Sequence, residues 1–420
     1  MINIETRRKL SRKEINDILL EKINEENMKV IQEEDERIQL NKIEYRKNKF
    51  NVVSLFSGAG GLDLGVELAG LASVLGEDVL SKCYNSTKEE FDKIREEGIF
   101  NTIFTNDMFK EANETYRNNF SNSIIKLEKD IRKVAEFPRC QVMIGGFPCP
   151  GFSEAGPRLI DDKRNFLYIH FIRALMQSQP EFFIAENVKG MMTLGKGEVL
   201  RQIIDDFSAA GYTVSAHLVN ARDYGVPQLR ERVFLVGVHK EKIEKKYGYR
   251  YQLPESTHDA REKINLFSSK KPYLTLKDAI GDLVENPGRI YEGDYSSIYM
   301  SRNRKKSWNE QSFTIQASGR QAPQHPGGEP MNKIDSNKWE FKGMLNRRLS
   351  IREIARIQTF PDWFEFSDGN NEKISENSKV DKIYKQIGNA VPVLLAKAIT
   401  QPIADFIYKN ILKEEDKNDN

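Results

Sequence analysis

Short apolar runs alternate with helical patterns from residue 51 onward. The runs are rich in β-branched and aromatic residues and occupy positions 52–56, 103–105, 142–144 and 182–185. Apolar helical patterns separate them, as at 62–71 and 166–176. This alternation predicts an α/β fold, a doubly wound and mostly parallel sheet with helices on both faces. Ligands of such sheets bind at the carboxyl ends of the strands, so the residues that follow each run are the candidates for function.

Two regions depart from this alternation. The first 50 residues are dense in Lys, Glu, Asn and Ile, and Ser11 to Glu14 has the spacing of a capping box. We expect a charged helical extension that packs against the main domain or, alternatively, forms a DNA-contacting or dimerising arm. Between 240 and 345 the apolar periodicity weakens while Gly, Pro, Ser, Asn and aromatic residues accumulate, which predicts a second, smaller domain. The predicted parts are an extension at 1–50, a first domain at 51–239 and 346–410, an inserted domain at 240–345 and a flexible tail at 411–420.

Helical patterns return after the inserted region. Ser350 to Glu353 forms another capping box, and Pro361 is expected to end the helix that follows it. Pro392 fits the first turn of a last helix, which Pro402 should end or kink.

Composition narrows the class of protein. Of the 420 residues, 39% are hydrophobic, as in soluble globular enzymes, which excludes fibrous and wholly disordered proteins. No run approaches the roughly 18 apolar residues of a membrane span, and the start of the chain lacks the apolar core of a signal peptide. We therefore expect a cytoplasmic protein with no membrane partner. The three cysteines have no CxxC spacing, which argues against disulfides and structural zinc, and we expect no metal.

Charge says little about the partner, because the whole chain has a net charge of +2. The region 240–345 holds 19 Lys and Arg residues against 14 Asp and Glu residues, a difference of +5. This excess favours phosphate contacts modestly, and a solvated lysine-rich face explains it equally well.

A glycine-rich turn follows the first run. Ser57 to Gly61 leads into a helical pattern, and such small residues let the backbone approach a ligand at a helix N-terminus. This layout indicates a nucleotide-like cofactor, with a tight turn that binds nothing as the alternative. The dinucleotide fingerprint G-x-G-x-x-G fails because Asp63 stands at its third glycine position, which weakens an NAD or FAD interpretation.

Acidic residues beyond the next strands are candidates for holding the cofactor. Asp107 follows the second run, where a carboxylate commonly binds ribose hydroxyls, and Glu77 and Asp78 compete for that role. Asp130 precedes Ile131 at the expected end of a third strand and could reach an adenine amino group. A solvated surface carboxylate is the alternative for each of them.

Cys149 lies between two prolines on a glycine-rich loop after the run at 142–144. Prolines make the loop rigid, and a cysteine attacks as a thiolate, which needs a favourable local field because its free pKa is about 8.5. The alternative is a small buried hydrophobe, although the loop has little apolar volume to pack. Glu186 follows the next strand at the same edge of the sheet.

These two residues suit attack on a cytosine ring. A thiolate that adds to carbon 6 converts the ring to an enamine that accepts a methyl group at carbon 5, and an acid at ring nitrogen 3 neutralises the developing charge. Glu186 is the candidate acid, with a structural pairing to Arg230 or Arg232 as its alternative. Gln228, Arg230 and Arg232 share one face before the strand 233–238, which suits holding a base and its phosphates, or else marks a charged edge strand.

Taken together and in this order, the motifs resemble the DNA cytosine-5 methyltransferase family of the bacterial restriction-modification type. The resemblance runs from about residue 51 to 407 and implies the S-adenosylmethionine-dependent methyltransferase fold, with 240–345 as an inserted target-recognition domain. The motifs are Phe56-Ser-Gly-Ala-Gly-Gly61, Asn106-Asp-Met, Asp130-Ile131, Gly146-Phe-Pro-Cys149, Glu186-Asn-Val188, Gln228-x-Arg-x-Arg232, Arg356-Ile-Gln-x-Phe-Pro361 and Gln386-Ile-Gly-Asn-Ala-Val-Pro392.

The resemblance implies that Cys149 is the nucleophile and Glu186 the acid, with Arg232 and Arg230 at the base. S-Adenosylmethionine, which leaves as S-adenosylhomocysteine, would be the cofactor. The residues expected to bind it are Phe56 at the adenine, Asp107 at the ribose, Asn389 at the methionine side, and Ser57, Gly58, Gly60, Gly61, Met108, Asp130, Ile131 and Pro148. The residues expected to contact DNA are Ser153, Gln228, Arg302, Arg304, Gln316 and Arg320.

The implied substrate is double-stranded DNA whose target cytosine flips out, because a thiolate cannot reach carbon 6 within the base stack. We expect a monomer, with a separately acting restriction endonuclease as its partner in function. Two departures from the family pattern stand out. The segment 72–102 is longer and more charged than usual, which keeps Glu77 as a rival to Asp107, and Met108 stands where a larger aromatic residue often covers the adenine.

Three other activities compete with this interpretation. A transfer-RNA cytosine methyltransferase shares the Pro-Cys and Glu-Asn-Val motifs, but its Cys-Phe-Thr run is absent and the recognition region is large. Enzymes that methylate exocyclic amines use an Asp/Asn-Pro-Pro-aromatic motif, which is also absent. A DNA-binding relative without catalysis is disfavoured by the presence of Cys149, Glu186 and Arg232.

Overall fold

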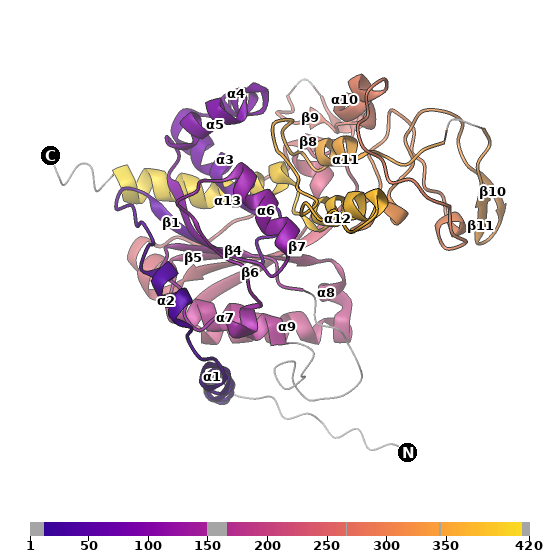
Figure 1. Ribbon diagram of the computed structural model, residues 1–420. Helices are drawn as coiled ribbons and strands as arrows, with labels where there is room; N and C mark the ends of the chain where they lie inside the picture. Colours follow the sequence, from indigo (N-terminus) through magenta and orange to yellow (C-terminus); the bar gives the residue numbers. More distant parts are fainter. Residues whose placement is uncertain (1–11, 149–165, 266, 344–345, 414–420) are drawn as a thin grey trace, which may run out of the picture.

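A seven-stranded sheet forms the centre of the protein (Figure 1). The structure is a computed structural model that describes residues 12–148, 166–265, 267–343 and 346–413. The strand order is β3-β2-β1-β4-β5-β7-β6, and all neighbours are parallel except β7, which runs antiparallel to β5 and β6. The strands are β1 Phe50–Leu55, β2 Phe100–Asn106, β3 Ile125–Leu127, β4 Val142–Gly145, β5 Phe182–Val188, β6 Tyr212–Asn220 and β7 Glu231–His239.

Helices cover both faces of this sheet, which confirms the doubly wound prediction (Figure 1). All six residues of β1 are buried, including the polar Asn51 and Ser54, so the strand does not alternate between a buried and an exposed face. Gly65 lets two of the covering helices approach closely, because a Cβ there would lie 2.3 Å from Ala396. One face carries α3 Gly61–Leu75, α4 Val79–Asn85, α5 Lys88–Arg95, α6 Lys110–Asn119 and α13 Val393–Ile407, and the other carries α1 Arg12–Lys29, α2 Glu34–Leu40, α7 Phe166–Ser178 and α9 Glu198–Ala209.

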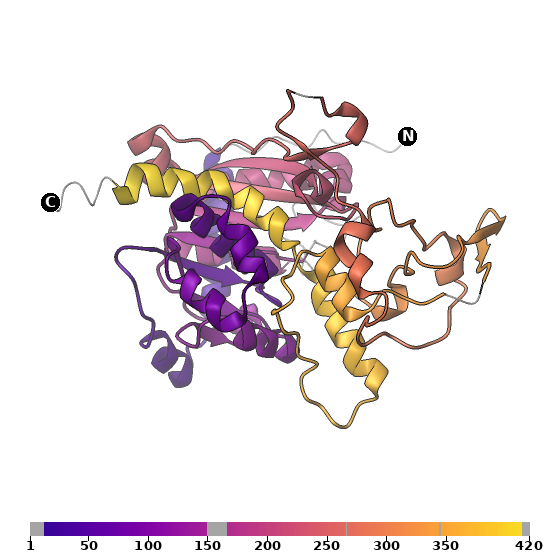
Figure 2. The ribbon, with the colours of Figure 1, turned by 90° about the horizontal axis from the view of Figure 1, so that it is seen from above.

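A second lobe lies beyond the carboxyl edge of the sheet (Figure 2). Its core joins residues far apart in sequence, including Ile280, Ile315, Leu349 and Ile387. Its elements are β8 His258–Asp259, β9 Lys271–Pro272, α10 Leu276–Ile280, β10 Asn332–Asp335, β11 Lys338–Glu340, α11 Ile351–Ile357 and α12 Glu376–Asn389. Between the lobes, α8 Gly190–Thr193 follows β5.

The packing places both boundaries of the second lobe later than predicted. The Tyr249 ring stacks on Phe406 of α13 at a centroid distance of 4.1 Å, and the Tyr251 hydroxyl donates to the Ile399 carbonyl oxygen at 2.9 Å. The chain just after residue 240 therefore belongs to the first domain, where its aromatic rings cover α13. At the other end α11 and α12 pack into the second lobe, while Phe360 and Phe364 between them pack with α3 and α6, so the chain visits the first domain there and stays in it from α13 onward.

The N-terminal extension packs against the first domain, which is the first of the two arrangements expected from the sequence. Leu19 and Ile23 of α1 are buried in the core that α7 and α9 share. Ser11, the first residue of the expected capping box, lies outside the described residues.

The predicted end of α11 was wrong, and Pro402 lies within a helix that continues past it. Helix α11 stops at Ile357, well before Pro361, because Thr359 takes a left-handed conformation with φ +59° that turns the chain. Pro402 does not end α13, which continues to Ile407 because tertiary packing of its apolar side against the sheet and α3 outweighs one missing backbone hydrogen bond. The capping box of Ser350 and Glu353 is confirmed.

Among the described residues, one stretch, Glu376–Leu412, is long and apolar enough to cross a membrane by length and composition. It comprises α12, a break at Ala390, and α13, and 61% of its most apolar window is buried within the protein. This burial is that of core helices.

Candidate active site

The loop after β4 is anchored in the core on both sides of its turn. Phe147 is buried among Tyr168, Phe171 and Phe207, and the Asn187 side-chain amide donates to the Phe147 carbonyl oxygen at 2.9 Å. This bond aims the chain at the carboxyl edge of the sheet, where Pro148 is exposed. The predicted nucleophile Cys149 and the predicted phosphate contact Ser153 follow directly and lie outside the described residues.

The other two cysteines are poor candidates for chemistry. Cys83 in α4 and Cys140 are both buried, and burial raises the pKa of the Cys83 thiol to about 11 and that of Cys140 still further. Cys140 precedes β4, so it lies at the opposite end of that strand from the loop that leads to Cys149. A thiolate is therefore disfavoured at both positions.

Glu186 and Arg232 form an ion pair at the carboxyl edge. The Arg232 Nε lies 2.8 Å from Glu186 Oε1, with side chains only 13% and 11% exposed. Burial raises the pKa of Glu186, and the neighbouring charges of Arg232 and Arg230 offset part of that effect. The loop passes closely, since a Cβ on Gly146 would meet Glu186 Oε2 at 3.2 Å. A polarised carboxyl group thus faces the loop that leads to Cys149.

Arg230 is buried and does not reach the edge, which corrects its predicted place at the base. Its guanidinium donates to the carbonyl oxygens of Ile315, Gly388 and Ala390 at 3.2, 2.9 and 3.0 Å. Burial lowers the pKa of Arg230 to about 9. These bonds tie β7 to the second lobe and to the turn that ends α12.

Gln228 is fully buried, which corrects its predicted contact with DNA. Its amide donates to Gln358 Oε1 at 2.8 Å, and its oxygen accepts the Ile315 backbone N–H at 2.8 Å. Gln358 in turn donates to the Ile387 carbonyl oxygen at 2.7 Å. We call Gln228, Arg230 and Gln358 the lobe latch. The sequence offered a signal for Gln358, since it lies inside the Arg356-to-Pro361 motif.

The glycine-rich loop and Asp107 meet as predicted. The Gly58 N–H donates to Asp107 Oδ2 and the Phe109 N–H to Asp107 Oδ1, each at 2.9 Å. Burial raises the pKa of Asp107, and these backbone bonds act against it. Glu77, its rival, instead pairs with Lys397 of α13. Asp107 is thus the carboxylate that the fold brings to the loop.

The loop itself is built for close approach. Phe56 takes a left-handed φ of +55°, and Gly60 takes +86° where a Cβ would press into the Phe120 ring at 2.4 Å. Gly61 faces the Val391 carbonyl oxygen, which would lie 2.5 Å from a Cβ. Ser57 Oγ is buried and has no hydrogen-bond partner among the described residues, which fits a pocket that a ligand completes.

The remaining predicted cofactor residues surround this loop at different depths. Asn389 is exposed between the two carbonyl groups that Arg230 holds, and Met108 is 58% exposed. Asp130 caps a 3-10 turn and pairs with Arg132, which lowers its pKa, while Ile131 is buried. A carboxylate has about four lone-pair sites, so Asp130 can accept a further donor.

Comparison with known proteins decides the family. The profile described as C-5 cytosine-specific DNA methylase matches residues 50–405. The chain belongs to this family. It is 59% identical over 407 residues to the Type II methyltransferase M.BsuRI of Bacillus subtilis, which covers 96% of this chain and 90% of that protein. It is also 59% identical over 397 residues to M.BspRI of Lysinibacillus sphaericus, which covers 94% and 91%.

The fold agrees with a solved structure. A crystal structure described as a DNA modification methyltransferase encoded within an Escherichia coli prophage superposes with a TM-score of 0.57 at 22% identity, covering 86% of this chain and all of the other. The predicted methyltransferase fold is confirmed, and the chain is a DNA cytosine-5 methyltransferase of the restriction-modification type.

The predicted DNA readers of this methyltransferase divide by burial. Arg302, Gln316 and Arg320 are exposed on the second lobe, and Arg320 Nε donates to the Tyr291 hydroxyl at 3.1 Å. Arg304 is buried, donating to the Tyr299 carbonyl oxygen at 3.0 Å and to Gln321 Oε1 at 2.8 Å. Its expected role at DNA is therefore corrected to holding its own loop.

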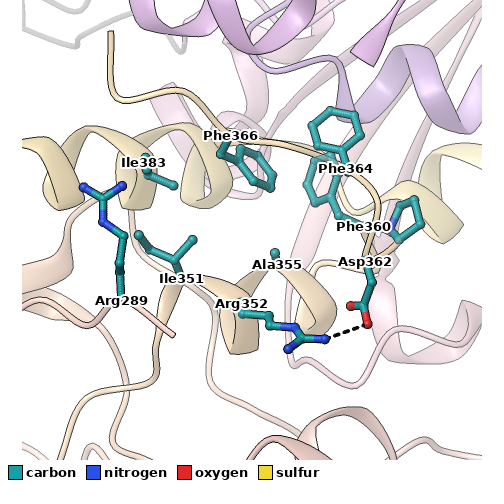
Figure 3. Close-up of a pocket in the computed structure, with 10 residues that line it drawn as sticks. Arg289, Ile351, Arg352, Ala355, Phe360, Asp362, Phe364, Phe366 and Ile383 are labelled. Atoms are coloured by element: carbon teal, nitrogen blue, oxygen red, sulfur yellow. Dashed lines mark hydrogen bonds and ion pairs between the residues drawn. The ribbon is translucent and has the colours of Figure 1, made fainter. Parts of the chain in front are cut away.

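A separate pocket lies between α11, α12 and the loop after Thr359 (Figure 3). It encloses about 230 Å³ and is lined by aromatic and aliphatic side chains, including Phe364 and Phe366. Its rim includes Arg352, which pairs with Asp362 at 3.2 Å, and Arg289, which pairs with Asp368 at 3.1 Å. None of the predicted cofactor or catalytic residues lines it.

Proposed function

We propose that this methyltransferase transfers a methyl group from S-adenosylmethionine to carbon 5 of a cytosine within a specific double-stranded DNA sequence. The relatives are named Type II methyltransferases, which supports a restriction-modification role beside a separately acting endonuclease. We propose that the enzyme acts as a monomer, because one chain supplies the glycine-rich loop, Asp107 and the Glu186–Arg232 pair.

The chain's residues carry the attack and the proton. Cys149 Sγ adds as a thiolate to carbon 6, and the electron pair of the C5–C6 double bond moves to carbon 5 while Glu186 protonates or hydrogen-bonds ring nitrogen 3. S-Adenosylmethionine supplies the methyl group as an electrophile and leaves as S-adenosylhomocysteine. Loss of the proton from carbon 5 then expels the Cys149 thiolate and restores the double bond.

The Glu186–Arg232 pair is the single observation that carries this proposal. Burial favours the neutral acid and raises the pKa of Glu186, whereas Arg232 at 2.8 Å favours the carboxylate and offsets part of that effect. A carboxyl group with a raised pKa is better suited to give a proton to nitrogen 3. Arg232 also keeps the carboxyl group turned towards the loop that leads to Cys149.

The cofactor is proposed to lie along the loop from Phe56 to Gly61. Asp107 is fixed by two backbone amides at that loop and retains lone pairs for ribose hydroxyls. The target base is proposed to flip out, since residues at a sheet edge cannot reach carbon 6 of a stacked base. The second lobe, with exposed Arg302 and Gln316, is proposed to read the DNA.

Covalent trapping tests the nucleophile. A duplex with 5-fluorocytosine in the recognition site should form a stable protein–DNA adduct after methyl transfer, because fluorine cannot leave as a cation. Cys149→Ala should abolish the adduct and methyl transfer but keep DNA binding. The matched variant Cys140→Ala should retain the adduct and methyl transfer. An adduct that persists in Cys149→Ala would refute the assignment, and bisulfite sequencing of host DNA would identify the methylated site.

Glu186→Gln tests the acid. It should lower turnover at least a hundredfold, in the range for loss of a general acid, with little change in cofactor affinity. A loss confined to cofactor binding would contradict the role at nitrogen 3.

A further inference from the structure

A buried glutamate of the N-terminal extension holds the turn that carries Asp130. Glu36 of α2 is 2% exposed, and its Oε1 accepts the backbone N–H groups of Ala135 and Glu136 at 2.9 and 3.3 Å. Its other oxygen receives Lys129 Nζ at 2.7 Å. One side chain from outside the matched family region thus binds both ends of the segment 129–136.

A buried arginine holds the same segment from the opposite side. Arg173 of α7 is fully buried and donates to the carbonyl oxygens of Ile131 and Val134. The charges that act favourably on it are Glu26 of α1 and Glu36 of α2. Both belong to the extension, so their negative charges offset part of the cost of burying this cation in the first domain.

Other contacts support the two ends of the segment. It follows β3, a strand of three residues at the edge of the sheet, so only one side receives ladder hydrogen bonds. Asn106 donates to the carbonyl oxygens of Leu127 and Lys129, each at 2.8 Å, which fixes the start of the turn. Ile131 and Val134 are buried in the core, and Glu36 and Arg173 add the charged side chains that bind the backbone of the turn.

We propose that the N-terminal extension is a positioning element of the cofactor site, with Glu36 as the residue that holds the Asp130 turn at the adenine. The proposal rests on the proposed function for the cofactor and the role of Asp130. The apolar contacts of Leu19 and Ile23 dock the extension, and Glu26 and Glu36 convert that docking into a defined backbone position. Glu36 acts through the turn and does not touch the cofactor.

The test compares three variants of the full chain. Glu36→Ala removes the acceptor, and Glu36→Gln keeps an oxygen for the two amides but loses the charge. Glu33→Ala is the matched control, because Glu33 also pairs with Lys129, at 3.4 Å, but is 71% exposed and has no bond to a backbone amide of the turn. Calorimetric titration with S-adenosylhomocysteine, steady-state KM for cofactor and DNA, and thermal unfolding are measured for each.

Glu36→Ala should weaken S-adenosylhomocysteine binding about tenfold, which corresponds to about 1.4 kcal/mol, with the KM for DNA unchanged. Glu36→Gln should recover most of the affinity, and Glu33→Ala should match the wild type. With an S-adenosylhomocysteine analogue whose purine lacks the 6-amino group, Glu36→Ala and wild type should bind nearly equally, because the donor to Asp130 is missing. A purely structural role would not distinguish the two ligands.

Three outcomes would overturn the proposal. A lower melting temperature with unchanged S-adenosylhomocysteine affinity would reduce Glu36 to a packing role. An equal loss for both ligands would place its effect away from Asp130. If Glu36→Ala does not fold, Arg173→Lys replaces it, because Arg173 holds the same turn, and equal affinities of Arg173→Lys and wild type for S-adenosylhomocysteine would overturn the proposal. Failure of the wild type to bind S-adenosylhomocysteine would instead refute the proposed function itself.

Discussion

Asp63 makes the stability of this methyltransferase depend on pH. It lies in the first turn of α3, directly after the glycine-rich loop, and is 1% exposed. The Tyr116 hydroxyl donates to Asp63 Oδ1 at 2.9 Å, but burial outweighs this bond and raises the pKa of Asp63 from 3.8 to about 7. We predict that Asp63→Asn removes this dependence while keeping an oxygen that accepts from Tyr116.

The magnitude follows from proton linkage. A carboxyl group whose pKa is raised on folding stabilises the protein at low pH, and this contribution disappears as the pH rises through about 7. At about 1.4 kcal/mol per pH unit, the rise from 3.8 to about 7 corresponds to about 4 kcal/mol of the free energy of unfolding. The positive end of the α3 dipole opposes this by about 1 kcal/mol or less.

Urea unfolding of wild type and Asp63→Asn at pH 5 and at pH 8 measures the effect. The free energy of unfolding of the variant, relative to wild type, should rise by about 3 kcal/mol between the two pH values. Asp78→Asn, which removes an exposed carboxylate near the same helix, should show no such change. A constant difference between Asp63→Asn and wild type would show that Asp63 ionises as readily in the folded as in the unfolded chain.

Three further substitutions test particular contacts. Arg230→Lys loses the planar fork that reaches three carbonyl groups, so it should cost about 3 kcal/mol in denaturant unfolding and weaken cofactor binding through the turn at Asn389. Gly237→Ala places a Cβ 1.9 Å from the Phe183 ring and should destabilise by about 2 kcal/mol or more in urea, whereas Gly281→Ala, whose Cβ would lie 3.5 Å from the flexible Lys277 side chain, should be neutral. Arg348→Lys should weaken DNA binding in a gel-shift assay but spare S-adenosylhomocysteine binding, because Arg348 orders the loop before Arg302 by stacking on Tyr295 at 4.3 Å and donating to the carbonyl oxygens of Gly293 and Asp294.

The central strands were predictable because burial on both faces gives them short runs of consecutive apolar residues, such as those at 142–144 and 182–185. The edge strand β6 gave no comparable signal. Most of Tyr212–Asn220 is only partly buried, and the strand includes polar residues on both faces. An edge strand is identified by the strand with which it pairs, and the sequence alone does not show which strand that is.

The lobe boundaries could not be predicted for a related reason. Loss of apolar periodicity after residue 240 marks the end of regular structure, not the end of the domain's core. Tyr249 and Tyr251 are irregular in backbone, yet they cover α13, a helix about 150 positions further along the chain. Likewise, the amphipathic pattern of α12 does not reveal which lobe it packs against. The structure shows that its apolar side meets Ile315 and Ile280.

For the site, the sequence predicts which residues come together but not the direction in which every side chain points. Motif spacing brought Asp107 to the glycine-rich loop and Glu186 to Arg232, because both pairs lie at strand ends that the sheet order makes adjacent. Asn187 belongs to the Glu186-Asn-Val188 motif, but its hydrogen bond to the Phe147 carbonyl oxygen could not be predicted. Neighbouring residues on a strand point to opposite faces, so Asn187 points away from the face of Glu186.

The clearest case is the Gln228, Arg230 and Arg232 face. Alternation correctly predicts that the three side chains share a side, but their surroundings change along the strand. The second lobe covers Gln228 and Arg230, which form their hydrogen bonds with Ile315 and with the turn after α12. It does not cover Arg232, which pairs with Glu186. Gln228 and Arg230 of the lobe latch therefore lie just before β7, and Arg232 stands two residues after Arg230 at the start of that strand. The same short segment holds the second lobe and supplies the partner of Glu186, so its side chains differ in role because the second lobe covers only the first two of them.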